Sequence, residues 1–367
     1  MFVTVVLLAI GLVLLVVGAD SLVKGASAIA SRFGISPVII GLTVVAFGTS
    51  TPEMAVSVSA AVTGNTDVAF GNVVGSNIGN ILLILGLSAV AGALAVSQRL
   101  IKLDVPILLV VSIVVLLMAL DGSIGRIDGA VLFAAIIGYT GWLVQAARRE
   151  RTDITAEYTE SVDALEQGVA GRPLAVQILL VVVGLALLVV GGQLLVNSAT
   201  EIAESIGVSD LVIGLTVVAI GTSLPELATS VLASLRGERD IAVGNVVGSN
   251  LFNLMAVLGL SGLVADKGID VAGGALTLDI PVMIASTLVL LPIFLNGFEI
   301  RRWEGFVLMA FYAVYVVYLV LDTSDHGAAD EVGAAAAIIT PLVLFVFVIA
   351  AVSSIRERRR IAATTAS

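Results

Sequence analysis

The chain has 367 residues, of which 59% are hydrophobic and only 13% are charged. Soluble domains have about 45–50% apolar and about 25% charged residues, so this composition excludes an ordinary water-soluble globule. The net charge of −10 argues against a nucleic-acid partner, which would need clustered cations. Because the chain has no Cys and one His, disulfides, thiolate sites and metal sites with several imidazoles are excluded. A membrane protein that crosses the bilayer several times remains.

Eleven apolar stretches follow one another along the chain, each close to the roughly 20 residues that a helix needs to cross a bilayer. We expect them at residues 2–18, 36–62, 68–93, 104–120, 127–147, 174–196, 209–235, 240–264, 279–296, 303–321 and 333–354. The longest interruption, residues 148–173, is expected to be a solvated loop. The predicted fold class is therefore an all-α polytopic membrane protein in the lipid bilayer.

The distribution of Lys and Arg among the loops predicts the orientation, because cytoplasmic loops carry an excess of cations. If the N-terminus lies outside, 16 of the 18 cations fall in inner loops or in the C-terminal tail. Only Arg126 and Lys267 then lie outside. We therefore expect a multi-pass protein of the cytoplasmic membrane with its N-terminus outside, its C-terminus inside and the loop 148–173 in the cytoplasm.

An internal repeat relates two parts of the chain that are 173 residues apart. Residues 41–88 and 214–261 align without a gap, and 30 of these 48 positions are identical. The most similar stretches are polar rather than lipid-facing, which a duplication used only for packing does not explain. Further along, the register slips by two, since LDVP at Leu103 corresponds to LDIP at Leu278.

Each copy contains five of the expected helices. Because five is odd, the second copy must cross the membrane in the opposite direction. Inverted repeats are typical of secondary transporters, whose binding site lies near mid-membrane between the copies. We expect a first repeat at 1–147, a second, inverted repeat at 174–321 and one additional C-terminal helix at 333–354.

Two acids, Glu53 and Glu226, lie deep within apolar stretches and occupy equivalent positions in the copies. A carboxylate at this depth costs several kcal/mol and indicates a functional site. A protonated Glu in a helix interface is the structural alternative, but two equivalent ones make it less attractive. No intramembrane Lys, Arg or His is expected near them, so the counter-charge is a bound cation or a proton.

The acids end the motifs GTSTPE (48–53) and GTSLPE (221–226). Pro52 and Pro225 lack an N–H and are expected to break each helix. Thr49 and Ser50 precede Glu53 by four and three residues, and so would share its helix face. Irregular backbone at this depth must line a cavity. The carbonyls expected to point into it are those of Ala46, Thr49, Ala219 and Thr222.

A second polar motif follows in each copy, GNVVGSNIGN (71–80) and GNVVGSNLFN (244–253). Ser76 and Asn80 are helical neighbours, as are Ser249 and Asn253. The remaining amides either brace the broken helices or bind an ion directly, and the sequence leaves both roles open for Asn72, Asn77, Asn245 and Asn250. The glycines of these motifs are expected to allow close helix packing.

The predicted site contains only oxygen ligands. Carboxylates and carbonyls suit Ca²⁺, which accepts 6–8 such ligands in flexible geometry, whereas Mg²⁺ retains its waters. Two negative charges balance one Ca²⁺ or two monovalent ions, which gives a basis for exchange on a shared site. When the site is empty, the facing carboxylates would repel each other and tend to take up a proton.

These motifs resemble the two signature repeats of the cation/calcium antiporter (CaCA) superfamily, and within it the prokaryotic sodium/calcium exchangers. The resemblance covers the first ten expected helices. It implies that Ca²⁺ and Na⁺ are the substrates, exchanged by alternating access without a cofactor. It implies that Glu53 and Glu226 hold Ca²⁺ with the carbonyls of Thr49 and Thr222. Groups implied for the flanking Na⁺ sites are Ser50, Ser76, Ser223, Ser249 and the carbonyls of Ala46 and Ala219, with Asn80 and Asn253 beside the central site.

The chain also departs from patterns in the superfamily. Some prokaryotic exchangers and the K⁺-dependent branch resemble this chain but have Asp at the position of Asn253. The Asn here argues against K⁺ coupling. The proton-coupled branch reads GN-x-x-E where this chain has GNVVG, which disfavours a Ca²⁺/H⁺ antiporter without excluding it. A cation channel is a weaker alternative, and an intramembrane enzyme lacks a nucleophile–base pair. The oligomeric state stays open, a monomer included.

The resemblance and the repeat together predict a division of labour among the helices. The second, third, seventh and eighth are expected to form a fixed ion-binding core. The first and sixth, which are long and rich in glycine, are expected to slide across it and open one side at a time. Two bare carboxylates are costly to move through lipid, so exchange should be obligatory.

Overall fold

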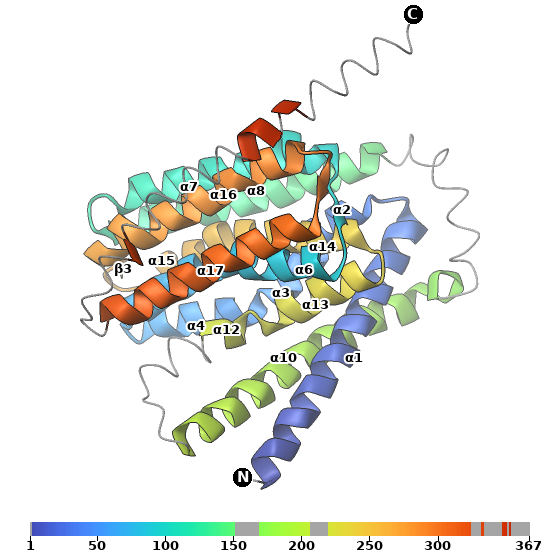
Figure 1. Ribbon diagram of the computed structural model, residues 1–367, viewed down its shortest axis with the longest axis horizontal. Helices are drawn as coiled ribbons and strands as arrows, with labels where there is room; N and C mark the ends of the chain where they lie inside the picture. Colours follow the sequence, from blue (N-terminus) through green and yellow to red (C-terminus); the bar gives the residue numbers. More distant parts are fainter. Residues whose placement is uncertain are drawn as a thin grey trace, which may run out of the picture.

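The computed structural model describes residues 2–150, 169–205 and 219–323, with short pieces at 332–333, 347–350 and 352–353. This part of the chain is almost entirely helical (Figure 1). Most of the expected loop 148–173, the first ten residues of the expected helix 209–235 and most of the expected helix 333–354 lie outside the described residues.

The helices up to residue 150 fall into five groups. In chain order the elements are α1 (Phe2–Phe33), α2 (Pro37–Ile40), the π-helical η1 (Gly41–Val45), α3 (Ala46–Thr49), α4 (Thr51–Val62), α5 (Thr66–Gly79), the π-helical η2 (Asn80–Leu85), α6 (Gly86–Ala91), β1 (Leu94–Ala95), the π-helical η3 (Leu100–Asp104), α7 (Val105–Ala119), β2 (Ser123–Ile124) and α8 (Arg126–Glu150).

A similar series follows after residue 168. Its described elements are the 3-10 turn η5 (Val169–Gly171), α10 (Leu174–Ser205), α12 (Ala219–Thr222), α13 (Leu224–Leu235), α14 (Arg239–Phe252), the π-helical η7 (Asn253–Val257), α15 (Leu258–Val264), β3 (Ile269–Asp270), the π-helical η8 (Ala275–Asp279), α16 (Ile280–Leu295), β4 (Glu299–Ile300) and α17 (Arg302–Thr323).

Among the described residues, eight helices are long and apolar enough to cross a membrane, and the bent pair formed by residues 37–49 and 51–62 makes up to nine. They coincide with the expected helices one to six and eight to ten. The protein is therefore a multi-pass membrane protein. Of the expected seventh helix, the structure describes the short helix Leu224–Leu235 together with α12.

Several expected boundaries are wrong. The first helix does not stop at residue 18 but continues to Phe33, and Gly34, with φ +60°, follows its end. Its second half contains charged residues that lie at a helix surface, so loss of apolar character does not mark the end of a helix. Helix α8 also continues three residues into the expected loop, to Glu150.

Two short strand pairs depart from the predicted all-α fold. β1 pairs antiparallel with β4, Leu94 opposite Ile300, and β2 pairs antiparallel with β3, Ser123 opposite Asp270. Each pair joins a connection from the first half of the chain to one from the second. Two-residue strands carry no periodic signal, so they could not be found from the sequence.

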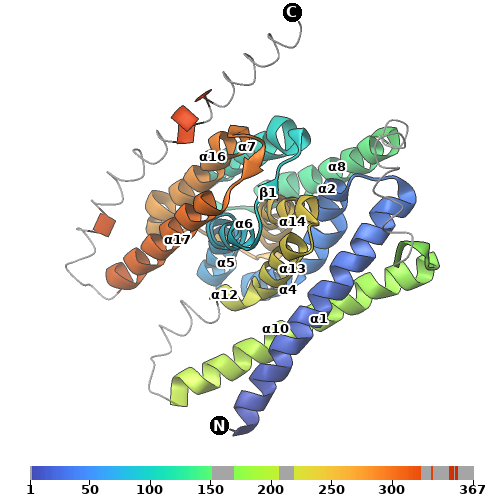
Figure 2. The same cartoon turned by 45° about the vertical axis from the view of Figure 1, so that its right-hand side comes forward.

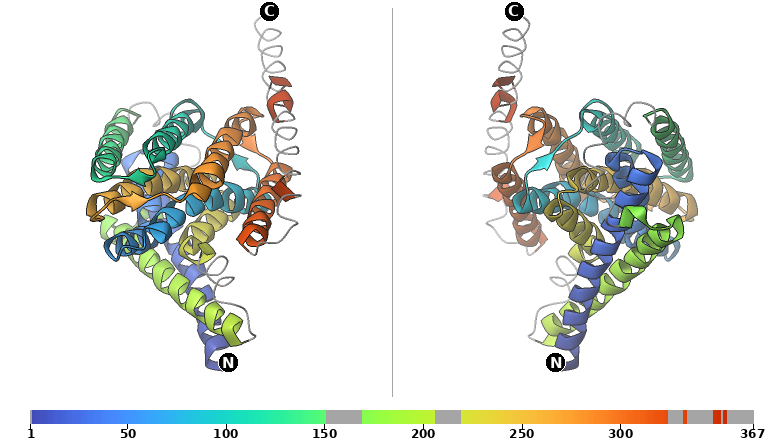
Figure 3. Two further views of the ribbon diagram at one scale, coloured as in Figure 1. Left: turned by 90° about the vertical axis from the view of Figure 1, so that its left-hand side faces the viewer. Right: turned by 90° about the vertical axis from the view of Figure 1, so that its right-hand side faces the viewer.

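The helices α1 and α10 cross each other on one side of the molecule, away from α16 and α17 (Figures 1 and 2), and project beyond the other helices (Figure 3). The two helices contact each other at glycines. If Gly18 were Ala, its Cβ atom would lie only 2.8 Å from the Gly184 carbonyl oxygen. Gly11 and Gly191 make the same kind of contact. The missing side chains let the two backbones touch, which makes α1 and α10 one packed unit.

The centre of the molecule is the continuous helix of α14, η7 and α15, in which a stretch of 18 residues is entirely buried. Gly244 and Gly248 allow residues 38–46 to pack directly on its backbone, as expected. At Gly71 and Gly75, by contrast, no described atom lies within 4 Å of the carbon that an Ala would add, so the expected close packing is not seen there.

Candidate ion-binding site

Both expected helix breaks occur, and each places a Glu in the first turn of a new helix. The chain bends by 47° between α3 and α4, with Pro52 in the first turn of α4. The same order of elements recurs at α12 and α13, with Pro225 in the first turn of α13. Glu53 and Glu226 are both fully buried there. A helix N-terminus carries partial positive charge, which favours a carboxylate at this position.

The two breaks are joined by a pair of reciprocal hydrogen bonds. The Ser50 hydroxyl donates to Oε1 of Glu226 at 3.1 Å, and the Ser223 hydroxyl donates to Oε1 of Glu53 at 3.0 Å. Each serine therefore binds the acid of the other motif, whereas helical spacing places Ser50 on the face of Glu53. The reason is local, because Ser50 has ψ 7° and lies outside the regular helix in which i and i+3 share a face.

The second oxygen of each carboxylate, Oε2 of Glu53 and Oε2 of Glu226, is buried and has no hydrogen-bond partner among the described residues. Neither Glu53 nor Glu226 forms an ion pair with another described residue. Buried polar atoms are nearly always satisfied in native proteins, so two such oxygens indicate a missing partner. A cation or a proton is the partner that suits a carboxylate oxygen.

Asn72 braces the break that carries Glu53. Its side-chain amide donates to the Glu53 carbonyl at 3.2 Å and to the Ser57 hydroxyl at 2.8 Å. Its Oδ1 accepts a hydrogen bond from the Thr222 hydroxyl at 3.4 Å. Because both ends of the amide are engaged, this geometry favours bracing over ion binding.

Asn245 repeats two of these contacts in the second motif. Its amide donates to the Ser230 hydroxyl at 2.9 Å, and its Oδ1 accepts from the Thr49 hydroxyl at 3.2 Å. The Thr49 hydroxyl also lies 3.5 Å from the hydroxyl of Ser249. Ser57 and Ser230 were missed by sequence reasoning, although both positions are serine in the two copies, a signal that could have revealed them.

The π-helical turns η2 and η7 begin at Asn80 and Asn253, and π-helical turns frequently mark functional sites. Asn80 donates to Oδ1 of Asn250 at 2.9 Å, and Asn250 donates to the carbonyl of Asn77 at 3.2 Å. Both amide atoms of Asn253 and Oδ1 of Asn80 are buried without a hydrogen-bond partner among the described residues. These atoms are available to a ligand.

The expected backbone ligands are only partly free. The carbonyl of Ala46 accepts the N–H of Ser50 at 3.0 Å and lies 3.4 Å from the Thr49 hydroxyl, so it is a hydrogen-bonded helix carbonyl rather than one released by the break. Pro52 instead releases the carbonyl of Gly48, four residues earlier. Ala219 begins α12, and its side chain lies outside the described residues.

Ser76 lies at the edge of the carboxylate pair, where its hydroxyl oxygen is 3.4 Å from that of Ser223. A cavity of about 20 Å³ is lined by both serines and by Tyr312 of α17. This volume suits about one water molecule or ion. Tyr312 lies far from the motifs in the sequence, and nothing in its local pattern marks it.

Helix α10 covers both breaks. A side chain at Gly48 would overlap Leu185, and one at Gly221 would overlap Val196. The glycines of the two motifs therefore serve to let α10 lie over the acids. The sequence predicts that the long helices meet the ion-binding helices, but not which residues make the contact.

Fold and site together define a multi-pass membrane protein whose two broken helices bring a pair of buried carboxylates together, ringed by hydroxyl and amide groups. The model of the family "Sodium/calcium exchanger protein" matches residues 3–145 and 176–321. The chain belongs to this family, which consists of cation antiporters rather than enzymes.

Individual relatives match over almost their whole length. CaxA of Alkalimonas amylolytica is 42% identical over 86% of this chain and 98% of its own. The sodium/calcium exchanger MaX1 of Methanosarcina acetivorans is 36% identical over 86% of this chain and 98% of its own. A solved structure of the sodium-calcium exchanger NCX_Mj, soaked with Na⁺ and Ca²⁺, superposes with a TM-score of 0.74 at 32% identity over 86% of this chain and 98% of that chain.

Proposed function

We propose that this protein exchanges Na⁺ for Ca²⁺ across the cytoplasmic membrane by alternating access. The observation that carries the proposal is the fully buried pair Glu53 and Glu226, in which each carboxylate has one oxygen held by the serine of the other motif and one oxygen without a partner among the described residues. A divalent cation between the free oxygens would neutralise both charges at once.

The proposed Ca²⁺ ligands are Glu53 and Glu226 with the carbonyls of Thr49 and Thr222. The proposed Na⁺ ligands are the four hydroxyls of Ser50, Ser76, Ser223 and Ser249 with the carbonyls of Ala46 and Ala219. The engaged carbonyl of Ala46 could still accept a cation through its second lone pair. Asn80 and Asn253 lie beside the central site, where their unpartnered amide atoms support a role in binding.

Coupling to Na⁺ rather than to protons is supported by the residues around the pair. Both GNVVG segments lack the acid of the proton-coupled pattern, and Asn253 adds no third carboxylate. MaX1 and NCX_Mj are sodium/calcium exchangers by name. Ca²⁺/H⁺ exchange is the alternative that the experiment below is designed to detect.

The proposed mechanism rests on two inverted five-helix repeats with the N-terminus outside. The contacts of the site occur in pairs that are related by the 173-residue offset, as Ser50 with Glu226 and Ser223 with Glu53 illustrate. In this mechanism α1 and α10 move as one unit over the core of broken helices. The empty, doubly charged site resists crossing, so net movement requires an ion on each half of the cycle.

The proposal is tested by Ca²⁺ uptake into proteoliposomes that contain Na⁺, K⁺ or a proton gradient. We expect saturable uptake with internal Na⁺ and little uptake with the other two. Uptake driven by the proton gradient alone would replace the proposal with Ca²⁺/H⁺ exchange. Flux that rises linearly with Ca²⁺ and needs no counter-ion would identify a channel instead.

The matched variants are Glu53→Gln and Glu226→Gln, which remove one charge and preserve shape. Each should abolish exchange while the purified protein still elutes as a single folded species. Asp121→Asn is the control, because Asp121 lies in a short connection away from the site, where it accepts the N–H of Ser123. Normal transport by either Glu variant would show that the central site is assigned wrongly.

A further inference from the structure

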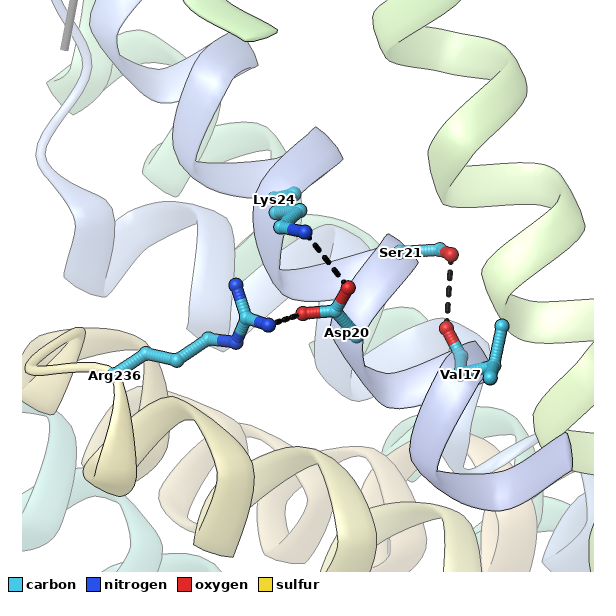
Figure 4. Close-up of polar contacts among 5 residues, drawn as sticks. All are labelled: Val17, Asp20, Ser21, Lys24 and Arg236. Atoms are coloured by element: carbon cyan, nitrogen blue, oxygen red, sulfur yellow. Dashed lines mark hydrogen bonds and ion pairs between the residues drawn. The ribbon is translucent and has the colours of Figure 1, made fainter. Parts of the chain in front are cut away.

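A cluster of charged groups joins α1 to the end of α13, well away from the ion site (Figure 4). Asp20 of α1 forms an ion pair with Arg236, which caps the C-terminus of α13. Lys24, one turn along α1, donates to the other Asp20 oxygen at 2.8 Å. The Ser27 hydroxyl donates to Glu238, just beyond Arg236, at 2.8 Å. Two contacts thus tie α1 to the turn at residues 236–238.

The equivalent positions in the other half of the chain carry no charge. Gln193 and Asn197 of α10 correspond to Asp20 and Lys24, and Thr63 corresponds to Arg236. Gln193 donates to Asn197 at 3.0 Å within its own helix. Thr63 donates to the carbonyls of Ser59 and Ala60 in its own helix. The two copies therefore make matching serine–carboxylate contacts at the ion site but differ here.

The packing of α1 and α10 on the other helices also differs between the two halves. Helix α1 packs extensively along α13, whereas α10 packs on α3, α12 and α13. Because α1 and α10 touch backbone to backbone through glycines, a restraint on α1 acts on both helices. The described arrangement is one of two that a pseudosymmetric pair of repeats could adopt, and the ion pair is made in this one.

We propose that Asp20 and Arg236 form a releasable latch that holds the α1–α10 unit against one end of the core. The latch consists of Asp20, Arg236 and the flanking Lys24. It favours the described arrangement, in which α1 lies against the turn at residues 236–238, and it must open before the unit can move. Under the proposed orientation this end faces the cytoplasm, so the latch sets the resting side of the exchanger. The inference deepens the proposed function and rests on it for the movement of the unit and for the side that this end faces, whereas the contact itself does not depend on it.

Val23 provides a reporter of the latch that does not depend on transport. It follows Asp20 by three residues and precedes Ser27 by four, so it shares their helix face, and it is 1% exposed. Because the chain has no Cys, Val23→Cys introduces the single thiol. Its rate of reaction with a water-soluble maleimide, in purified protein without Na⁺ or Ca²⁺, measures how often this interface opens.

We expect Asp20→Asn and Arg236→Gln each to raise that rate by about two- to fivefold, as befits a partly exposed ion pair. The double variant should react no faster than either single one, because both remove the same contact. Gln193→Ala, at the equivalent position of α10, is the control and should leave the rate unchanged. High salt should accelerate labelling when the pair is intact and not in Asp20→Asn, since salt screens exposed charges.

Unchanged labelling in both single variants, additive effects in the double variant, or an equal effect of Gln193→Ala would overturn the proposal. If the variants fail to fold, the salt dependence of Val23→Cys alone decides, and its absence refutes the latch. In proteoliposomes, opening the latch should raise the apparent Ca²⁺ affinity from the inner side by a similar factor. A labelling shift without any Na⁺/Ca²⁺ exchange would leave the latch standing and refute the proposed function.

Discussion

At the scale of single residues, the reciprocal serine–carboxylate bonds are the feature on which the site depends. Ser50 and Ser223 each hold one oxygen of the opposite acid, at 3.1 and 3.0 Å, and both serines are buried. A hydrogen bond to a charged group contributes about 1.5–3 kcal/mol. Without it the carboxylate can rotate away from a bound ion, and the site also loses one hydroxyl oxygen.

We therefore expect Ser50→Ala and Ser223→Ala each to raise the half-saturating Ca²⁺ concentration by roughly ten- to hundredfold, the equivalent of that free energy. The two variants should behave alike because their bonds are equivalent. Uptake into Na⁺-loaded proteoliposomes measures the effect. Ser59 is an exposed serine of α4, and Ser59→Ala should have the same half-saturating Ca²⁺ concentration as the parent protein. A large difference between the two buried variants would contradict the reciprocal geometry.

That the two acids are buried together at the broken helices could be predicted from the sequence, because an acid deep in an apolar helix and its duplicate stand out against lipid-facing Leu and Val. Which atoms meet could not be predicted. Helical spacing assigns Ser50 to Glu53, but the break at Ser50 redirects it to Glu226. Likewise Asn80 bonds to Asn250 rather than to its helical neighbour Ser76. Contacts across the two copies depend on how the copies dock, which local spacing does not determine.

At the scale of the helices, the crossing of α1 and α10 depends on glycines that replace side chains with backbone contact. A methyl group at Gly18 would lie 2.8 Å from the Gly184 oxygen and 2.9 Å from the Leu188 nitrogen. Both of these are backbone atoms, which cannot rotate aside as a side chain can. Adding a methyl group there must push the helices apart.

Gly18→Ala should accordingly lower the free energy of unfolding by about 1–3 kcal/mol, the usual cost of overpacking a close contact. The loss would be seen as a lower melting temperature of the detergent-solubilised protein. Gly138→Ala on α8 is the matched control, because no described atom lies within 4 Å of the added carbon. It should be neutral or slightly stabilising, since Ala favours a helix over Gly. Equal stability of the two variants would refute the close crossing.

The positions of these helices could be predicted more accurately than their ends. An apolar run identifies a crossing helix because the bilayer demands it, but a helix such as α1 continues for fifteen residues into polar sequence without losing its hydrogen bonds. The side on which the α1–α10 unit rests is also beyond the sequence pattern. The proposed cycle has two nearly equivalent arrangements, and we expect them to differ through a few charged contacts such as Asp20 with Arg236.

At the scale of the whole molecule, the central question is whether the two halves cross the membrane in opposite directions. Val62 ends α4 and Leu235 ends α13, and these residues are equivalent in the repeat. They are 65% and 63% exposed, so a probe would reach both equally well in a solubilised protein. Any difference between them in the membrane therefore reports the side on which each lies.

We expect a thiol at Val62→Cys to react with a membrane-impermeant maleimide added to intact cells, and one at Leu235→Cys to react only after the membrane is permeabilised. The physical reason is the excess of cations in alternate loops, which keeps the turn with Arg236 and Arg239 in the cytoplasm. The Cys-free parent gives the background. Labelling of both positions from one side would show parallel repeats and remove the basis for a symmetric alternating-access cycle, whereas exchanged sides would keep the inverted repeat and reverse its orientation.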